Sequence, residues 1–383
     1  MIYTRSYLKE RINAGIKGKI GMLVSSDNLC NQGVRAVLAE TDLRSTKRYA
    51  YLSPNLFDGI YQYPAPADLK GIGIIDIRPQ VNRSVQSEVS LTTVEEFDRT
   101  KADFRCAVDD EDAIRQLLIS VPINDEEIVV STLDSLTAGG GTWSAVGDAT
   151  NLVASSDWFV KGSAAIKYDI GAGATTTAGI QNTSLNSFDI TEYLMKTVFH
   201  WQYLSNADNI TDFKIRIGSS PLNYYEVTAT TTHSNTAFAV GTNLLRFDMS
   251  SKTTTGTPVD TACTYVAIFM TKTAGKISQT GFYADHIWLK KGEVYQVGYY
   301  SDYPWQSSTG TYLIDSTSDE DFLVMTSDEI DMVIHKCVEY AASEVDEVNL
   351  ETRASSKYVS LRDTYVSNNP SESKSILTTY YNF

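Results

Sequence analysis

Residues able to do chemistry are few in this sequence, and they are scattered. The four histidines are His200, His233, His286 and His335, and none stands in an H-E-x-x-H pattern or at another metal-ligand spacing. The four cysteines lie far apart and form no C-x-x-C pair, which argues against a zinc site and against a disulfide framework. A catalytic base also needs a partner that orients it, and the sequence offers none beside any histidine. We therefore predict that the chain is not an enzyme.

Two other motifs also lack the residues that a ligand site requires. The glycine-rich stretch at residues 138–141 has no Lys-Ser or Lys-Thr end of the kind that closes a phosphate-binding loop. The acidic run at residues 109–112 lacks the glycine and the terminal glutamate of a calcium-binding EF-hand loop. We expect a flexible turn and a solvated acidic loop at these places, and no cofactor.

Aromatic side chains are the more promising chemical resource. The chain has 23 tyrosines and 5 tryptophans, and exposed aromatic rings stack on the apolar faces of sugars and line protein interfaces. We select Trp158, Trp201, Tyr224 and Trp288 as candidate glycan-stacking residues. The alternative, that these rings belong to a buried core, stays open because alternation along a strand buries every second side chain.

The charge of the chain excludes some functions. The net charge is −15 and the sequence pI is about 4.7, so wrapping of nucleic acid, which needs a basic patch, is not expected. No run of 18 apolar residues is present, and we expect no membrane span. The first residues are polar and lack the apolar stretch of a secretory signal, so we expect none.

Composition divides the chain into a middle segment and two flanks. Residues 128–291 are rich in Thr, Ser, Gly and Ala and are nearly neutral, whereas the flanks hold most of the acidic excess. Many strand-like runs cross the middle segment, and Phe199, Trp201 and Tyr203 alternate onto one face. We predict an α+β scaffold made of residues 1–127 and 292–383, with a C-terminal long helix, interrupted by an inserted antiparallel β-sandwich (a jelly roll) at 128–291.

The clearest helix begins at Thr326. Glu329 follows at capping-box spacing, and apolar residues then recur at helical intervals, beginning with Ile330, Val333, Ile334 and Val338. The helix is expected to reach about residue 366, with or without a break. Shorter helices are predicted at residues 5–14, 27–41 and 93–101, and a hairpin is predicted between residues 115–121 and 127–131.

The middle segment resembles carbohydrate-binding jelly-roll modules. The resemblance lies in Trp143, in Trp158 followed by residues 162–169, in residues 188–190 and in residues 285–289. It implies a sugar-binding sandwich. In such modules an aspartate near the last strand often supports a structural calcium ion, and Asp285 occupies that place.

The flanks are similar to another class, the neck proteins of tailed bacteriophages. The similar stretches are residues 42–48, 52–54, 61–71 and 75–80, together with the terminal helix. The resemblance implies a head-to-tail adaptor (connector): a homo-oligomeric ring, commonly twelve-fold, that lies beneath the portal protein and contacts tail or neck proteins. DNA would pass through the ring without specific binding. The protein would be made in the host cytoplasm and located in the neck of the virion.

From this resemblance we predict interface residues on the terminal helix and at the end of the chain. They are Ile330, Val333, Ile334, Val338, Tyr380, Tyr381 and Phe383. A structural role as an adaptor is the main functional hypothesis. The alternative hypothesis is a tail or baseplate protein that binds host surface glycans through the β-sandwich.

Overall fold

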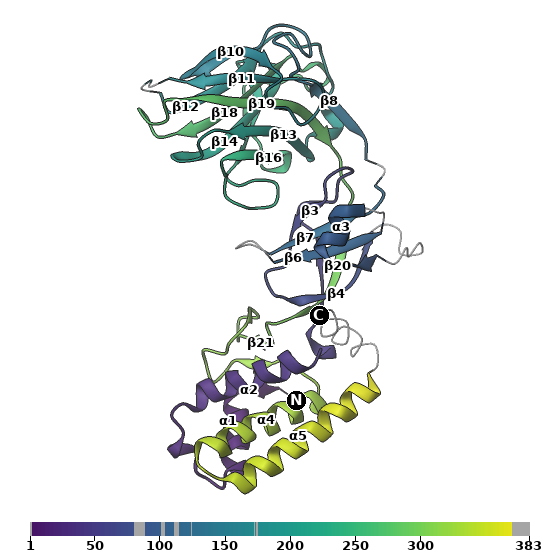
Figure 1. Cartoon of the computed structure of the whole chain (residues 1–383), viewed down its shortest axis with the longest axis vertical. Coiled ribbons are helices and arrows are strands. Elements are labelled where there is room, and N and C mark those ends of the chain that lie inside the picture. Colours follow the sequence, from purple (N-terminus) through teal and green to yellow (C-terminus); the bar gives the residue numbers. More distant parts are fainter. Residues whose placement is uncertain are drawn as a thin grey trace. The chain divides into compact units, whose positions relative to one another are not determined.

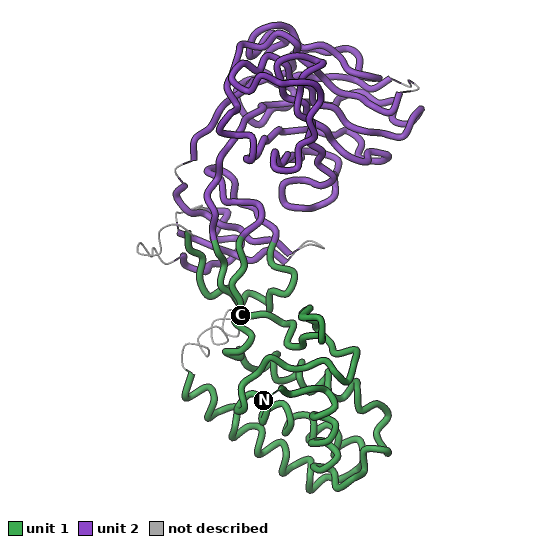
Figure 2. The backbone as a smooth tube through the Cα atoms, turned by 180° about the vertical axis from the view of Figure 1, so that it is seen from behind, with its two compact units in different colours: residues 1–51, 65–88, 296–383 green, residues 52–64, 89–295 purple. Residues whose placement is uncertain are grey.

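The computed structural model describes residues 2–79, 89–100, 104–110, 115–123, 125–171, 173 and 175–369 (Figure 1). The chain forms two compact units whose segments alternate along the sequence (Figure 2). Unit 1 contains residues 1–51, 65–88 and 296–383, and unit 2 contains residues 52–64 and 89–295. The predicted insertion began at residue 128, whereas unit 2 also takes up residues 52–64 and 89–127. Predicted interface residues Tyr380, Tyr381 and Phe383 lie outside the described residues.

Unit 1 is mainly helical, with short strands. Its helices are α1 (Arg5–Gly15), α2 (Ser26–Glu40), α4 (Ser327–Glu344) and α5 (Val348–Asn368). One small sheet has the order β2 (Lys47–Tyr51), β20 (Tyr295–Ser301) and β4 (Leu69–Pro79). Another has the order β1 (Tyr3–Thr4), β23 (Phe322–Leu323), β21 (Trp305–Gln306) and β22 (Tyr312–Leu313).

The start of α4 has the predicted capping box. The Glu329 side chain accepts a hydrogen bond from the backbone N–H of Thr326 at 2.8 Å. Its other oxygen accepts from the Ser45 backbone N–H at 3.1 Å and from the Tyr365 hydroxyl at 2.9 Å. Glu329 is fully buried, so these bonds compensate for its desolvation. One carboxylate thus joins the start of α4, the end of α5 and the segment after α2.

The predicted long C-terminal helix is two helices. Residues 345–347 separate α4 from α5, and Asp346 has a positive φ of 57°, a left-handed conformation that interrupts a helix. The two helices pack against each other, and α4 also packs against α1 and α2. The predicted helices at 5–14 and 27–41 correspond to α1 and α2.

The predicted interface stripe on α4 lies inside the core of unit 1. Ile330, Val333, Ile334 and Val338 are at most 7% exposed, and they share one hydrophobic cluster with Leu8 and Ile12 of α1 and with Val34 of α2. The periodicity identified the apolar face correctly, but the chain's own helices cover that face. These four side chains are therefore not available for contacts with another copy of the chain, and this part of the prediction is corrected.

Unit 2 contains a small mixed sheet and a large sandwich. The small sheet has the order β3 (Gln62–Pro64), β7 (Gln116–Ser120), β6 (Arg105–Asp109) and β5 (Ser90–Leu91), and α3 (Val94–Thr100) packs on it through Phe97. The predicted hairpin between residues 115–121 and 127–131 is wrong. Strand β7 pairs with β3 and β6, while β8 (Glu127–Ser131) pairs with β19 in the sandwich.

The sandwich has two six-stranded antiparallel sheets, and none of the described sheets is closed (Figure 1). The first sheet has the order β10 (Ala149–Ser155), β11 (Ala165–Ile170), β19 (Gln279–Lys290), β13 (Thr197–Leu204) and β16 (Gly241–Asp248), with β8 paired to β19. The second has the order β17 (Thr253–Thr255), β15 (Asn223–Ala229), β14 (Ile210–Ser220), β18 (Tyr265–Lys272), β12 (Thr177–Asn182) and β9 (Ser144–Gly147). The predicted antiparallel sandwich and C-terminal helical region are confirmed.

Side chains from both sheets fill the core of the sandwich. Phe213, Ile215 and Ile217 of β14 face Leu245 and Phe247 of β16 within one buried cluster. These residues alternate with polar ones along each strand, as expected where one face of a sheet is buried. The alternation fixes which residues lie on the outer faces, where a ligand could bind.

Helix α2 and helix α4 approach closely at Gly33, which supplies a test of the helical core. A Cβ atom placed on Gly33 would lie 2.2 Å from the Cys337 Sγ and 3.2 Å from its Cα. Although alanine favours a helix by about 1 kcal/mol over glycine, we expect Gly33→Ala to lower the free energy of unfolding by about 1–3 kcal/mol through overpacking. Urea denaturation measures this change.

Gln32→Ala, an exposed change in the same helix, is the matched control and should be near neutral. Adding Cys337→Ala to Gly33→Ala should restore part of the loss. A stabilised Gly33→Ala variant would contradict the close approach.

Candidate functional site

A register shift in β19 decides which aromatic side chains share the outer face of the first sheet. Between the pairs His200–Ile287 and Trp201–Asp285, β19 has one extra residue, His286, whose φ is +48°. This is the geometry of a β-bulge. Because of the bulge, Tyr283 and Trp288 lie on the same face although they are five residues apart. The same face carries Phe199, Trp201 and Tyr203 of β13. Phe199 is the strand partner of Trp288, and Tyr203 is the strand partner of Tyr283.

The loop between β10 and β11 crosses this outer face and is fastened to it. The Asp285 Oδ2 accepts hydrogen bonds from the backbone N–H groups of Val160 and Lys161, at 2.7 and 2.9 Å. The Asp134 Oδ1 accepts from Ser163 and Ala164, at 2.7 and 3.1 Å. Two carboxylates therefore hold the consecutive amides of one loop.

The fastened loop covers part of the predicted stacking set. Trp288 is only 2% exposed; its ring contacts Phe199, and the Lys161 ammonium lies 4.7 Å from its centroid. It has no free ring face for a sugar, and we remove it from the stacking candidates. Trp158 is half-buried and packs against Tyr203 and Tyr283, with ring centroids 5.4 and 5.8 Å away.

Asp285 acts as a loop anchor in this geometry. It is fully buried, and burial raises the pKa of its carboxyl group despite the two amide hydrogen bonds. Calcium takes 6–8 oxygen ligands, whereas the described residues hold no cluster of three or more His, Cys, Asp or Glu side chains suited to a metal. The nearby Asp134 also uses one oxygen for loop amides. Calcium at Asp285 therefore stays a hypothesis, which the chelation experiment below tests.

The second sheet presents a different outer face, which carries Tyr224. Because Phe213, Ile215 and Ile217 face the core, Lys214 and Arg216 point outward from β14. Tyr265, Ala267 and Phe269 of β18 form a small hydrophobic cluster of their own, separate from the core, with Val146 and Tyr224 packed against it. We call Lys214, Arg216, Tyr224, Glu226, Tyr265 and Phe269 the Arg216 face.

Aromatic rings on the Arg216 face lie beside glycines. Gly179 is the strand partner of Phe269, and Gly218 is the partner of Tyr224. A Cβ on Gly179 would come within 2.6 Å of the Phe269 Cβ, and one on Gly218 within 2.9 Å of the Tyr224 Cβ. An aromatic ring next to a glycine can lie across it, because no side chain competes for the space. Buried rings on the outer side of a sandwich sheet are unusual, since such a face is ordinarily polar.

Arg216 lies at the centre of this face. Its guanidinium carbon is 4.8 Å from the ring centroids of both Tyr224 and Phe269. Its Nε donates to the Glu226 Oε2 at 2.7 Å, and the Lys214 Nζ lies 3.6 Å from the other Glu226 oxygen. Burial opposes the charge of Arg216, but the hydrogen bond and charge of Glu226 outweigh it and raise the arginine pKa. Planar cationic, anionic and aromatic groups are thus held side by side.

The histidines are buried or half-buried, and none is oriented by a carboxylate within 3.5 Å in the described part of the chain. His200 has no exposed surface and contacts the His286 carbonyl and the Gln202 side chain, each at 3.3 Å. Burial lowers its pKa to about 4. His233 is 2% exposed, and its Nε2 lies 2.8 Å from the Gln62 carbonyl oxygen. Burial, with a contribution from Arg246, lowers the pKa of His233 to about 3.

Comparison with known proteins finds similar folds among solved structures. No family model matches the sequence, and no curated protein matches it. Several of the similar solved structures are carbohydrate-binding modules. The CBM22-1 xylan-binding domain of Paenibacillus barcinonensis Xyn10C is 11% identical, with a TM-score of 0.26, over 43% of this chain and 96% of that domain.

Two further modules match at a comparable level. The family 11 module from Clostridium thermocellum is 13% identical, with a TM-score of 0.29, over 43% of this chain and 94% of the module. A family 30 module is 8% identical, with a TM-score of 0.29, over 45% and 98%. The neighbours share a β-sandwich, but similarity at this level carries no information about a ligand. Whether this chain binds one must be argued from its own residues.

Sequence reasoning placed Tyr224 among its candidates but missed Arg216 and Glu226. A signal was present: Lys214, Arg216 and Glu226 occupy the outward positions of two strands whose inward positions are apolar.

Among the helices of the described residues, none combines the length and the apolar character that a membrane span requires.

Removal of the Asp285 carboxylate tests the loop anchor. Asp285→Ala leaves two amide groups without their acceptor, and we expect a loss of about 3 kcal/mol in the free energy of unfolding. Asp285→Asn keeps one acceptor oxygen and should lose less. Urea denaturation gives the loss, and limited proteolysis should cut within residues 156–164.

Asp208→Ala, an exposed change, is the control and should be near neutral. EDTA should leave the melting temperature of the wild type unchanged. A fall in melting temperature with EDTA that calcium reverses would contradict the anchor interpretation and support the calcium hypothesis.

Two of the three buried histidines, His200 and His233, predict how stability depends on pH. Their folded pKa values lie below the ordinary value of 6.5, so the unfolded chain takes up their protons at a higher pH than the folded chain does. Stability is therefore retained above pH 6.5 and falls as the pH is lowered below it. Each pH unit should cost about 1.4 kcal/mol per histidine down to about pH 5. Denaturation of wild type and His200→Gln checks this, and equal slopes for the two would contradict it.

Proposed function

We propose that this chain binds a glycan on the Arg216 face of the second sheet. The observation that carries the proposal is the arrangement of Arg216, which lies over two aromatic rings and is hydrogen-bonded to Glu226. A sugar ring has an apolar face and an edge of hydroxyl groups. Both kinds of contact are available within one patch here.

Tyr224 supplies the apolar contact. It is half-buried on strand β15, near the edge of the sheet, and its ring centroid is 5.9 Å from that of Tyr265. Tyr265 and Phe269 are 2% and 3% exposed, so they support the patch from below while Tyr224 meets the ligand. Stacking on an aromatic ring contributes about 0.5–1.5 kcal/mol beyond the area buried.

The charged groups supply hydrogen bonds to hydroxyls. Arg216 still has terminal N–H donors beyond the Nε that Glu226 uses, and a carboxylate has several acceptor positions. Side-chain exposures of 32% for Arg216 and 19% for Glu226 leave both groups within reach of a ligand. Hydrogen bonds to ionised groups contribute about 1.5–3 kcal/mol each, enough to orient one sugar unit.

An ordinary solvated ion pair is the competing explanation. Exposed ion pairs contribute little to stability, and they form without aromatic side chains packed beneath them. The separate apolar cluster under Arg216 favours a binding surface over such a pair. The predicted adaptor ring and virion location remain predictions, and the α4 stripe that was expected to make ring contacts is occupied by the chain's own helices.

A glycan array probed with the full chain, followed by titration of the best ligand, tests the proposal. We expect Arg216→Ala and Glu226→Gln each to weaken binding by about 10- to 100-fold, the loss of one charge-assisted hydrogen bond. Tyr224→Ala should weaken it by about tenfold.

Arg35→Ala, which removes an exposed arginine of unit 1, is the matched control and should bind as the wild type does. An array without any bound glycan, or an Arg216→Ala variant that binds as tightly as the wild type, would refute the proposal.

A further inference from the structure

Unit 2 has a pocket away from the Arg216 face. This pocket, of about 390 Å³, lies between the small sheet and the edge of the sandwich. One wall is formed by β3, β7 and α3. The other is formed by β13, β16 and the turn that precedes β16. Its volume is near the lower end of the range for small-molecule sites, about 300–1,000 Å³.

Contacts across the pocket hold its two walls together. His233, in the turn before β16, lies 2.8 Å from the Gln62 carbonyl oxygen, and its ring meets that of Tyr63 edge-on at 5.4 Å. Phe57 and Phe199 meet edge-on at 4.8 Å. The Asn243 side chain closes the turn through hydrogen bonds with both the N–H and the carbonyl of Ala239. The pocket therefore has a defined shape before any ligand arrives.

Three polar atoms of the lining residues have no hydrogen-bond partner among the described residues. They are the Gln116 Oε1, the His233 Nδ1 and the Trp201 Nε1, and all three are buried. Gln116 and His233 are only 5% and 2% exposed. A buried polar group without a partner costs about 1–3 kcal/mol, so three around one pocket indicate that something else bonds to them.

The hydrogen-bonding capacity of these atoms can be assigned. A carbonyl only accepts, so the His233 Nε2 that contacts Gln62 carries the proton, and the Nδ1 of the neutral ring is an acceptor. Burial keeps the ring neutral, with a pKa of about 3. The indole Nε1 of Trp201 is a donor, and the Gln116 oxygen is an acceptor. A ligand must then offer both donors and acceptors.

The rest of the lining indicates a neutral ligand. The hydroxyls of Thr232, Ser234 and Thr236 form a mutually bonded group, with oxygens 2.6–3.4 Å apart. Phe97 and Tyr61 add aromatic surface. Among the described lining residues Asp98 alone carries a charge, and it is exposed. No lysine or arginine is among the described lining residues, so a phosphate or a carboxylate would find no cation in the pocket wall itself.

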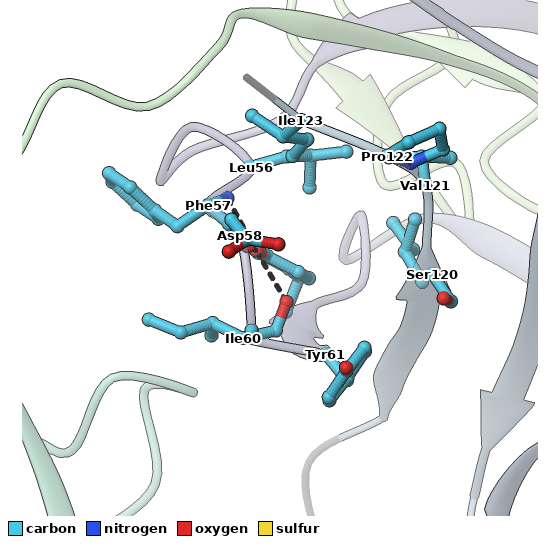
Figure 3. A pocket seen from close by; sticks show the side chains of 12 residues that line it. Leu56, Phe57, Asp58, Ile60, Tyr61, Ser120, Val121, Pro122 and Ile123 are labelled. Atoms are coloured by element: carbon cyan, nitrogen blue, oxygen red, sulfur yellow. Dashed lines mark hydrogen bonds between the residues drawn. The ribbon is translucent and has the colours of Figure 1, made fainter. Parts of the chain in front are cut away.

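A neighbouring pocket lacks unpartnered polar atoms of this kind. A hollow of about 460 Å³ is lined by residues 56–61, 63 and 119–123 (Figure 3). Its Tyr63 hydroxyl is hydrogen-bonded to the backbone of Phe57 and Ile60. None of its described lining residues has a buried polar side-chain atom without a partner. It therefore offers a ligand no unmet hydrogen bond, in contrast with the pocket beside Gln116.

We propose that the pocket beside Gln116, His233 and Trp201 binds one neutral sugar unit, whose hydroxyls donate to Gln116 and His233 and accept from Trp201. A hydroxyl can donate and accept at once, so a sugar satisfies all three atoms. The aromatic walls contact its apolar face. This site is separate from the Arg216 face and does not depend on it.

Saturation-transfer NMR of the full chain with four methyl glycosides tests the pocket: glucoside, galactoside, mannoside and N-acetylglucosaminide. We expect at least one to bind, and methyl glucuronide to bind more weakly than the glucoside because of its charge. Gln116→Met removes the side-chain amide and keeps a similar volume, and Trp201→Phe removes the indole N–H together with part of the ring. Each should weaken binding by about tenfold or more.

Gln116→Met should not lower the melting temperature, because it removes an unpartnered acceptor. It thus separates binding from folding if Trp201→Phe proves unstable. Arg216→Ala should leave binding in the pocket unchanged, so failure of the Arg216 face and failure of the pocket are distinguishable. Absence of binding by all four glycosides, or binding lost in Arg216→Ala but kept in both pocket variants, would overturn the proposal.

Discussion

The bulge at His286 is the constraint on which the sandwich of unit 2 depends. Strand β19 is central in the first sheet, since it pairs with β8, β11 and β13. Its extra residue keeps Phe282, Ala284, Ile287 and Leu289 in the core while Tyr283 and Trp288 stay outside. Without it, one half of the strand would turn its apolar residues to solvent. The bulge also places Asp285 where it meets the amides of the loop after β10.

The apolar side chains on the two outer faces of the sandwich are shielded from solvent in different ways. On the first sheet, the chain's own loop covers Trp288, and two carboxylates hold that loop. On the second sheet, the described side chains packed beside Tyr265 and Phe269 are those of Val146, Tyr224 and Arg216. The guanidinium of Arg216 covers the rings of Tyr265 and Phe269 instead, as a long side chain with an apolar stem and a polar head can do. The outer face of the first sheet is thus covered by a loop of the chain itself. The outer face of the second sheet is a surface on which partly exposed charged groups lie over buried aromatic rings.

Sequence reasoning predicted most elements and few of the site residues. Strict alternation in β13 and β14 and the capping box at Thr326 are local signals, so the sandwich and helix α4 could be predicted. The pairing of β8 with β19 is not local and no motif marks it. Periodicity found Val333 and Val338 but cannot tell whether a helix of the same chain or another copy covers them. The face on which Trp288 lies depends on the β-bulge at His286. The bulge shifts the alternation of inward and outward side chains by one residue, and no clear sequence pattern predicts it. The Gln116 pocket joins segments more than 100 residues apart.

The chain passes between the two units four times, after residues 51, 64, 88 and 295. During synthesis, helices α1 and α2 emerge early, yet the helix that covers Leu8, Ile12 and Val34 is α4, which begins near residue 327. At a translation rate of about 5–20 residues per second, this apolar surface stays uncovered for roughly 15–60 s until α4 has been synthesised. Unit 2 receives its last strand before α4 is made. The order of synthesis therefore exposes unit 1 to chaperones and to wrong contacts for longer than unit 2, although unit 1 starts first.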